Sequence, residues 1–325
     1  MKKKLIIIRV DGNFKIGFGH FERQYRLALY FLKKNYKVIF VSNNLYSNQA
    51  KKLNKKKIRL INTPNIPGSN GDLKFLKKII IKNSANFLIL DSYKITSGFQ
   101  KKMLSKNYKL IVYDDYSNLS NYYCDFLINQ NIYANKKLYF KKINNSILLL
   151  GAKFFSIEKK IYTKKYEKNS KNILICLGGS INSTLINKIL NFISSQNIEN
   201  IKFFIIGKIN KMKLPIKIRE KVLIKDYTDN IHKIASLCNF AITGGGNLAL
   251  EMSILKKKLL LFQINNTQKQ NIEFFRKKRL AIIGGTKDKL NKKNIEKFLK
   301  NNFKQRKLNV NGDGHKIIFN VLEKR

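Results

Sequence analysis

Short apolar runs of strand length alternate with longer amphipathic stretches along this chain, and the whole series occurs twice. Strands that are joined by helices pair in parallel, so this alternation predicts open parallel sheets covered by helices. The first series runs from a strand at 5–10 to one at 147–150, and the second begins with a strand at 172–177. We therefore predict an α/β fold with two Rossmann-like domains that face each other across a cleft. The predicted boundaries are 1–152 for the N-terminal domain, 153–170 for a charged linker and 171–325 for the C-terminal domain.

The chain has 325 residues, which suits two domains of about 100–200 residues each. Ligands of open parallel sheets bind beyond the carboxyl ends of the strands. We therefore expect the functional residues in the loops that follow the strands, with the ligand in the cleft between the two halves.

The net charge of +47 arises from 66 Lys and Arg against 19 Asp and Glu. Such an excess is typical of nucleic-acid or anionic-membrane binding, but it also accompanies the Lys, Asn and Ile enrichment of AT-rich genomes. The lysines are scattered, and the chain lacks an arginine-rich arm or an RNA-binding aromatic signature. We favour the compositional interpretation and expect no nucleic-acid partner, although the charge should help to attract an anionic substrate.

The cysteines and the first apolar run indicate the compartment. Cys124, Cys176 and Cys238 have neither metal-site spacing nor a disulfide framework, which favours a reducing cytoplasm. The run at 5–10 is too short for a membrane span or a secretory signal. We expect a cytoplasmic protein with no cofactor, no metal and no membrane insertion.

A glycine-containing loop follows the first strand and leads into a helix. Gly17 and Gly19 allow positive φ and close backbone approach, and the free N–H groups of a helix start attract anions. As a dinucleotide fingerprint the loop fails, because Glu22 occupies the third glycine position. His20 stands at the helix start, where a neutral imidazole serves as a general base. On chemistry alone, a histidine here is equally typical of a helix cap or a core residue.

Four carboxylates follow predicted strands of the first half: Asp11, Asp91, Asp114 and Asp115. Each is expected either to orient His20 or hold a polar ligand, or to cap a helix or turn. Asp11 is nearest to His20 in the sequence and is our candidate for the orienting residue.

Seven blocks of the sequence, taken together and in order, resemble the PseG/SpsG-like UDP-sugar hydrolases of pseudaminic acid biosynthesis. The blocks are Arg9-x-Asp11 with Ile16-Gly17-x-Gly19-His20-x-x-Arg23, then Asp91-Ser92-Tyr93, Asp114-Asp115, Cys124-Asp125 leading to Asn129-Gln130, Leu177-Gly178-Gly179-Ser180, Gly244-Gly245-Gly246 to Glu251, and Asp313-Gly314. They span nearly the whole chain, and the first block is the most specific. Gln24-Tyr25 departs from the family, which has a Cys-Leu-like pair there.

The resemblance implies a GT-B-like fold of two Rossmann-like domains. It also implies metal-independent hydrolysis of UDP-2,4-diacetamido-2,4,6-trideoxy-β-L-altropyranose to the free sugar and UDP, by attack of water on the anomeric carbon. It implies His20 as the base and Tyr93 as an active-site residue. Glu251 is expected to accept both hydroxyls of the ribose, although a first-turn acid that stabilises the helix dipole fits the same position. The expected substrate-binding residues are Arg9, Gly17, Gly19, Arg23, Asp115, Asn266 and Gln268. The expected UDP-binding residues are Gly178, Gly179, Ser180, Gly245, Gly246, Asn247 and Glu251.

Several alternatives stay open at this point. The polar cluster within 263–271 can shift its register by one residue, and related trideoxy sugars fit the same loops. His232 and His315 are expected on a helix surface and in the tail. A glycosyltransferase of the same fold is the nearest alternative to a hydrolase, and a non-catalytic nucleic-acid-binding protein is the alternative from another class. We expect a monomer that acts on a small-molecule UDP-sugar.

Overall fold

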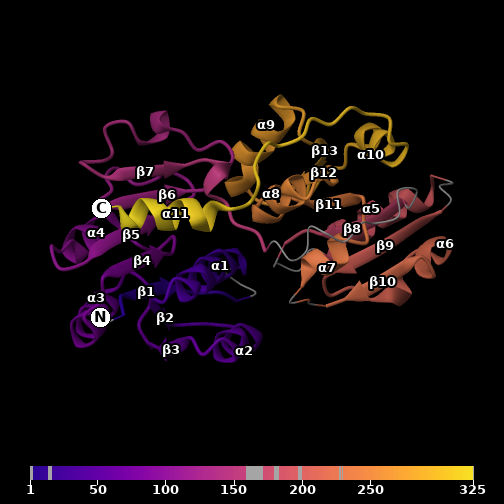
Figure 1. The fold of residues 1–325 in the computed structure, drawn as a ribbon. Coiled ribbons are helices and arrows are strands. Elements are labelled where there is room, and N and C mark those ends of the chain that lie inside the picture. Colours follow the sequence, from indigo (N-terminus) through magenta and orange to yellow (C-terminus); the bar gives the residue numbers. More distant parts are fainter. Residues whose placement is uncertain are drawn as a thin grey trace. The chain divides into compact units, whose positions relative to one another are not determined.

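A computed structural model describes residues 3–13, 17–158, 171–178, 183–196, 200–226, 228 and 230–324. The chain forms two compact units, Met1–Ile157 with Gly312–Arg325 and Glu158–Asn311 (Figure 1). Each unit contains one parallel sheet with helices on it, so the predicted α/β architecture of two Rossmann-like domains is confirmed.

The first unit is built on a seven-stranded parallel sheet with the order β3-β2-β1-β4-β5-β6-β7. Its strands are β1 (Leu5–Val10), β2 (Lys37–Ser42), β3 (Arg59–Asn62), β4 (Phe87–Asp91), β5 (Lys109–Tyr113), β6 (Phe126–Asn129) and β7 (Ile147–Leu150). The chain proceeds from β1 toward one edge and then returns to add β4 on the other side of β1. The strand order therefore reverses between β1 and β4, which is where such sheets bind ligands.

Helices cover both faces of this sheet. They are α1 (Gly19–Lys33), α2 (Ser47–Lys55), α3 (Asn70–Asn83), α4 (Ser97–Met103) and α11 (Gly314–Glu323), with 3-10 turns at η1 (Lys136–Tyr139) and η2 (Ala152–Phe154). Ile6 and Ile8 of β1 lie in one apolar cluster with α1 and α11, whereas Leu5 and Ile7 lie in another with α3 and α4. Because successive side chains point to opposite faces, a strand covered on both sides is apolar throughout, as β1 nearly is.

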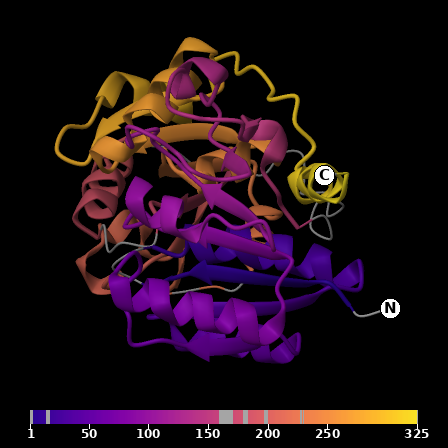
Figure 2. The ribbon, with the colours of Figure 1, turned by 90° about the vertical axis from the view of Figure 1, so that its left-hand side faces the viewer.

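The C-terminal residues correct the predicted domain boundary, because Gly312–Arg325 belong to the first unit and not to the second. Phe319 of α11 packs against Phe31 of α1 with 5.3 Å between ring centroids, and both are buried. Gly314 N–H donates to the Phe155 carbonyl, and a Cβ on Gly314 would lie 2.0 Å from the Phe154 carbonyl oxygen. The apolar face of α11 thus completes the core beside α1 (Figure 2).

The predicted linker also begins too early. Phe154 and Phe155 are buried in the first unit, so residues up to Ile157 are part of its fold. Residues 159–170 lie outside the described part of the chain.

The second unit has a six-stranded parallel sheet with the order β10-β9-β8-β11-β12-β13. Its strands are β8 (Lys171–Cys176), β9 (Ile201–Ile206), β10 (Val222–Lys225), β11 (Phe240–Gly244), β12 (Lys258–Gln263) and β13 (Ile282–Thr286). Its helices are α5 (Ser183–Ser194), α6 (Ile216–Arg219), α7 (Ile231–Ala235), α8 (Asn247–Ile254), α9 (Lys269–Lys277) and α10 (Lys292–Leu299), with 3-10 turns at η4 (Lys211–Lys213) and η5 (Asn266–Gln268). Here the order reverses between β8 and β11, which marks the corresponding position for a ligand.

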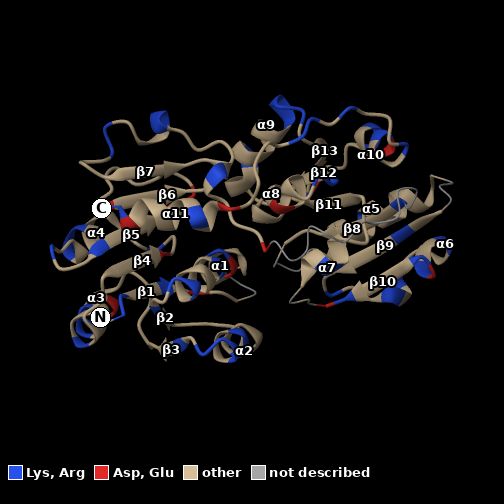
Figure 3. Ribbon diagram, in the orientation of Figure 1, with Lys and Arg blue, Asp and Glu red and all other residues tan. Residues whose placement is uncertain are grey.

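The basic residues are spread over helices, strands and loops of both units, as Figure 3 shows. This distribution agrees with the scattered lysines of the sequence. Within the described residues, no helix combines the length and the apolar content that crossing a membrane requires.

Candidate functional site

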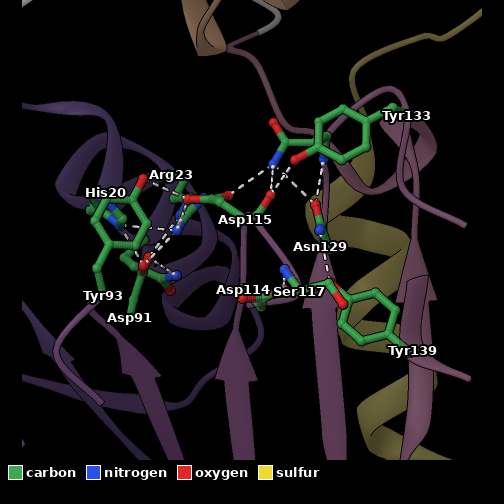
Figure 4. Close-up of polar contacts among 12 residues, drawn as sticks. His20, Arg23, Asp91, Tyr93, Asp114, Asp115, Ser117, Asn129, Tyr133 and Tyr139 are labelled. Carbon is green, nitrogen blue, oxygen red and sulfur yellow. Dashed lines mark hydrogen bonds and ion pairs between the residues drawn. The ribbon is translucent and has the colours of Figure 1, made fainter. Parts of the chain in front are cut away.

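His20 and Asp91 meet where the strand order of the first sheet reverses. β1 ends at Val10, whose register partner on β4 is Asp91, the last residue of that strand. His20 is the second residue of α1, the helix that the loop after β1 leads into. Its Nδ1 lies 2.6 Å from Asp91 Oδ1, and both side chains are buried (Figure 4). The geometry therefore puts a histidine–carboxylate pair at the expected binding position of the sheet.

The Asp91 carboxylate is surrounded by donors. Besides the His20 contact, Arg23 donates from Nε to Oδ2 at 2.8 Å and from Nη2 to Oδ1 at 2.6 Å. Gln24 Nε2 donates to Oδ2 at 2.7 Å. Charge-assisted bonds of this kind are short and directional, so Asp91 is fixed in position. Gln24, which departs from the family pattern, thereby acquires a defined contact that the sequence did not indicate.

Arg23 lies between two buried carboxylates, Asp91 and Asp115. Its Nη1 donates to Asp115 Oδ1 at 2.8 Å, in addition to the bonds with Asp91. Burial alone would raise the pKa of each carboxyl, but the Arg23 guanidinium holds the pKa values of both Asp91 and Asp115 below their usual range, and His20 acts in the same direction. Burial alone would lower the pKa of Arg23, yet Asp115 and Asp91 raise it. All three side chains are therefore charged near neutral pH.

The charge on Asp91 determines which nitrogen of His20 carries the proton. An ionised carboxylate only accepts hydrogen bonds, so Nδ1 must be the protonated nitrogen when His20 is neutral. Arg23 Nη2 also approaches Nδ1 to 3.0 Å, but its two hydrogens have carboxylate acceptors, Asp91 Oδ1 at 2.6 Å and Asp115 Oδ2 at 3.2 Å, so it does not require a lone pair on Nδ1. Nε2 then has the lone pair, and a lone pair on a carboxylate-oriented imidazole is what a general base requires.

Tyr93 lies against His20 and is bonded to the same network. Its ring packs edge-on against the imidazole, with 4.5 Å between the centroids, and its hydroxyl donates to Asp115 Oδ2 at 2.9 Å. Tyr93 is 53% exposed, whereas His20 beneath it is almost fully buried. Tyr93 is therefore the member of the group with most surface available for a ligand.

Amide side chains extend the network along the carboxyl end of β6. Asn131 Nδ2 donates to Asp115 Oδ1 at 3.1 Å and to Asn129 Oδ1 at 3.1 Å. Asp114 faces away from this group and accepts from Tyr139 Oη at 2.5 Å, which makes it a structural acceptor. Asn131 is thus a site residue that sequence reasoning missed, although the neighbouring Asn129-Gln130 pair was a signal for it.

Asp11 does not contact His20, which corrects its predicted orienting role. Its Oδ1 accepts from Arg9 Nη1 at 2.9 Å, from Ser42 Oγ at 2.7 Å and from the Asn43 N–H at 2.7 Å. These bonds join the ends of β1 and β2, away from β4. Asp91 occupies the position beside His20 because β4, and not β2, lies on that side of β1.

Arg9 is also a structural residue, which corrects its predicted role in binding the substrate. Its side chain is fully buried, and its Nε donates to Asp72 Oδ1 at 3.0 Å in addition to the bond with Asp11. A buried guanidinium needs such compensation, since an unpaired buried charge is strongly destabilising. The Arg9 side chain therefore has no exposed atoms with which to bind a ligand.

The glycines of the first loop keep the backbone open next to His20. Gly17 has φ +92°, in the left-handed region that favours glycine, and nothing lies within 4 Å of the position of a Cβ. Gly19 begins α1. Gly17 and Gly19 are both partly exposed, and Ile16 lies outside the described residues.

Two predicted phosphate loops follow β8 and β11 of the second unit. Gly178 has φ +113° and open space around it, while Gly179 and Ser180 lie outside the described residues. The Gly245 N–H already donates to Gln268 Oε1 at 3.1 Å. The donors that this loop presents to an anion are therefore expected from Gly246 and Asn247 onward, where α8 begins.

Gln268 holds two loops together. Its Oε1 accepts from the Ile264 N–H at 3.0 Å as well as from Gly245, so it fixes the loop after β12 to the loop after β11. Asn266 is exposed in η5, two residues away. Of this predicted pair, Asn266 has the side chain available for a ligand.

Glu251 is paired with His232, which corrects the predicted surface position of that histidine. His232 is buried in α7, and its Nε2 lies 2.7 Å from Glu251 Oε2. Glu251 is also buried and lies in α8, the helix that follows β11. The second unit therefore has a histidine–carboxylate pair of its own.

The chain is similar in sequence to two curated proteins, and no family model matches it. An uncharacterized protein of Methanocaldococcus jannaschii is 26% identical over 289 residues, which are 84% of this chain and 58% of that protein. UDP-2,4-diacetamido-2,4,6-trideoxy-beta-L-altropyranose hydrolase of Campylobacter jejuni is 24% identical over 269 residues, which are 77% of this chain and 88% of the enzyme. The chain thus spans little more than half the length of the first relative.

Solved structures confirm the fold over the full chain. MurG of Acinetobacter baumannii superposes with a TM-score of 0.66 at 10% identity, covering 99% of this chain and 100% of MurG. A glycosyltransferase of Rickettsia africae has a TM-score of 0.63 at 11% identity, covering 100% of this chain and 99% of that one. The chain therefore has the GT-B-like fold of two Rossmann-like domains that its sequence predicts.

Proposed function

We propose that this protein hydrolyses a UDP-linked 2,4-diacetamido-2,4,6-trideoxy sugar to the free sugar and UDP. The observation that carries the proposal is the His20–Asp91 pair at the reversal point of the first sheet, since its geometry suits a general base. The sequence similarity to the Campylobacter jejuni hydrolase supports the substrate class. The proposal assigns the sugar to the first unit and UDP to the second.

In the proposed reaction, His20 Nε2 accepts a proton from water as the water oxygen bonds to the anomeric carbon. The bond between that carbon and the β-phosphate oxygen breaks, and its electron pair leaves with UDP. Asp91 and Arg23 keep the imidazole in the required tautomer, and Tyr93 positions water or sugar beside it. The diphosphate is a good leaving group, so the second unit needs mainly N–H donors at Gly246 and Asn247 to bind it. Glu251 is proposed to accept the ribose hydroxyls.

A glycosyltransferase that uses a UDP-sugar donor is the second candidate, favoured by the likeness to glycosyltransferase structures. The two candidates differ in their need for an acceptor. We expect the purified protein to release UDP stoichiometrically with free sugar when the UDP-linked diacetamido sugar is the only substrate. UDP release that requires an added acceptor would overturn the hydrolase proposal in favour of the transferase.

We further propose a monomer in a reducing compartment, without a nucleic-acid partner. The described cysteines are free and buried, and the basic residues do not gather on one element (Figure 3). Any binding to DNA is expected to disappear at moderate ionic strength, because only counterion release would drive it. A filter-binding assay across salt concentrations measures this, and salt-resistant, sequence-selective binding would contradict it.

Replacing Asp91 by asparagine should lower kcat by about 100- to 10,000-fold, with a smaller change in KM. The amide has no charge to hold Nδ1 protonated, so Nε2 is no longer reliably the basic nitrogen. The imidazole is still present, but without a fixed tautomer it is a poor acceptor for the proton of water. Steady-state UDP release measures the effect, and Asp288→Asn, an exposed carboxylate of the second unit, is the matched control. An unchanged kcat for Asp91→Asn would contradict the orienting role.

A further inference from the structure

His232 and Glu251 form a buried pair on α7 and α8, the helices that precede and follow β11 along the chain. Thr243 on β11 is in register with Cys176 on β8, at the carboxyl ends of the two strands between which the order reverses. Burial raises the pKa of the Cys176 thiol to about 11, and the nearby Glu251 carboxylate adds to the effect. Glu251 lies in α8, which begins three residues after β11 ends and packs against β11, so it is close to the strand ends where an open parallel sheet binds its ligand.

The partner of Glu251 comes from a different helix, 19 residues earlier in the chain. α7 and α8 are held together at a second point, because Lys257 Nζ, just after α8, donates to the Cys238 carbonyl at 2.6 Å. This bond fixes the chain after α7 against the chain after α8. The 2.7 Å contact between His232 Nε2 and Glu251 Oε2 is thus set by the packing of both helices.

Burial of a carboxylate costs free energy of folding, so its presence at this position favours a functional role over a purely structural one. Side chains of His232 and Glu251 are only 6% and 8% exposed, so both groups lose most of their hydration. Apolar residues of similar volume often fill such positions at no cost in stability. A carboxylate offers about four lone-pair sites, so a bond from His232 restricts its orientation without using all of its capacity to accept hydrogen bonds.

We propose that His232 is a positioning residue for nucleotide binding, which holds the Glu251 carboxylate in the orientation that accepts the 2′- and 3′-hydroxyls of the ribose. The inference rests on the proposed function, because it takes UDP as the ligand of the second unit. His232 does not touch the nucleotide in this account; it acts through Glu251. Removal of the His232 side chain should therefore weaken the binding of the ribose hydroxyls and not that of the rest of the nucleotide.

The test compares UDP with 2′-deoxy-UDP by isothermal titration calorimetry on the full chain. Wild type should bind UDP more tightly than 2′-deoxy-UDP. His232→Leu should weaken UDP binding by about tenfold, the value of one well-oriented hydrogen bond, and leave 2′-deoxy-UDP nearly unchanged. His232→Gln, whose Nε2 can donate close to the position of the imidazole Nε2, should restore most of the preference. Glu251→Gln should lose the same preference and add little to His232→Leu in the double variant.

Three results would overturn the inference, and they separate it from the proposed function. If wild type binds UDP and 2′-deoxy-UDP equally, the ribose contact fails while UDP binding stands. If His232→Leu weakens both nucleotides alike, or neither, His232 supports the fold and not the ligand. If wild type binds no UDP at all, the proposed function fails together with the inference.

Discussion

Replacing His20 by alanine is expected to reduce kcat by about 100- to 10,000-fold, which is the usual contribution of a general base. The variant retains Asp91, Arg23 and the helix start, so only the proton acceptor for water is lost. UDP binding should stay within about twofold of wild type, because the proposal assigns the nucleotide to the second unit. Steady-state UDP release and calorimetric UDP titration measure the two quantities separately.

His315→Gln is the matched control for this variant. His315 lies on α11 and packs against the Tyr30 ring at 4.8 Å, outside both candidate sites. Its replacement should leave kcat unchanged, so a loss in His20→Ala alone excludes a general effect of removing a histidine. A His20→Ala protein that retains wild-type kcat would contradict the assignment of the base.

Replacing Arg23 by methionine is expected to lower the free energy of unfolding by about 3–5 kcal/mol at pH 7. Methionine fills much of the volume of the arginine, but Asp91 and Asp115 are then buried without the cation between them. Urea unfolding at pH 7 measures the loss, and Arg59→Met on the exposed edge of β3 is the control. A change of less than 1 kcal/mol would show that the two carboxylates do not depend on Arg23.

The stability difference between wild type and Arg23→Met should shrink as the pH falls from 7 toward 4. In wild type the pKa of Asp91 is depressed, so its contribution to stability is complete above the unfolded value near 3.9 and is lost only as the pH falls through the lower folded value. Without Arg23, burial raises the pKa of both carboxyls, so they take up protons at higher pH. Once neutral, they no longer destabilise the variant as unpaired buried charges. A difference that grows on acidification would contradict this account.

Much of the fold follows from the sequence because buried parallel strands carry their own signature. β1 is predicted from its apolar run and has all six residues buried. Elements without that signature are not indicated by the sequence pattern. β3 (Arg59–Asn62) is an edge strand that is only partly buried, and β13 (Ile282–Thr286) contains two glycines. α2 buries only Leu53 and Gln49, so its polar sequence lacks a clear apolar stripe.

The partners within the site could not be predicted from distance along the chain. His20 and Asp91 are 71 residues apart, and Asp11 was preferred only because it is close in the sequence. The strand order determines which carboxylate lies beside His20, since β4 pairs with β1 on the side of His20 while Asp11 bonds toward β2. Arg9 did carry a usable signal, because a charged residue inside an otherwise apolar buried strand requires a buried partner such as Asp72.

The domain to which the C-terminal helix belongs could not be predicted, for a similar reason. Its sequence is amphipathic and identifies it as a helix, but nothing local indicates which core it completes. Phe319 packs against Phe31 in the first unit, almost the whole chain away. Contacts at such separation depend on the complete fold.

The most direct test of the account is hydrolysis of the UDP-linked diacetamido sugar in oxygen-18 water, with mass spectrometry of both products. Water attack at the anomeric carbon with His20 as the base predicts one oxygen-18 atom in the free sugar and none in UDP, with label incorporation slowed in His20→Ala. Oxygen-18 in the phosphate of UDP would mean attack at phosphorus and would contradict the account.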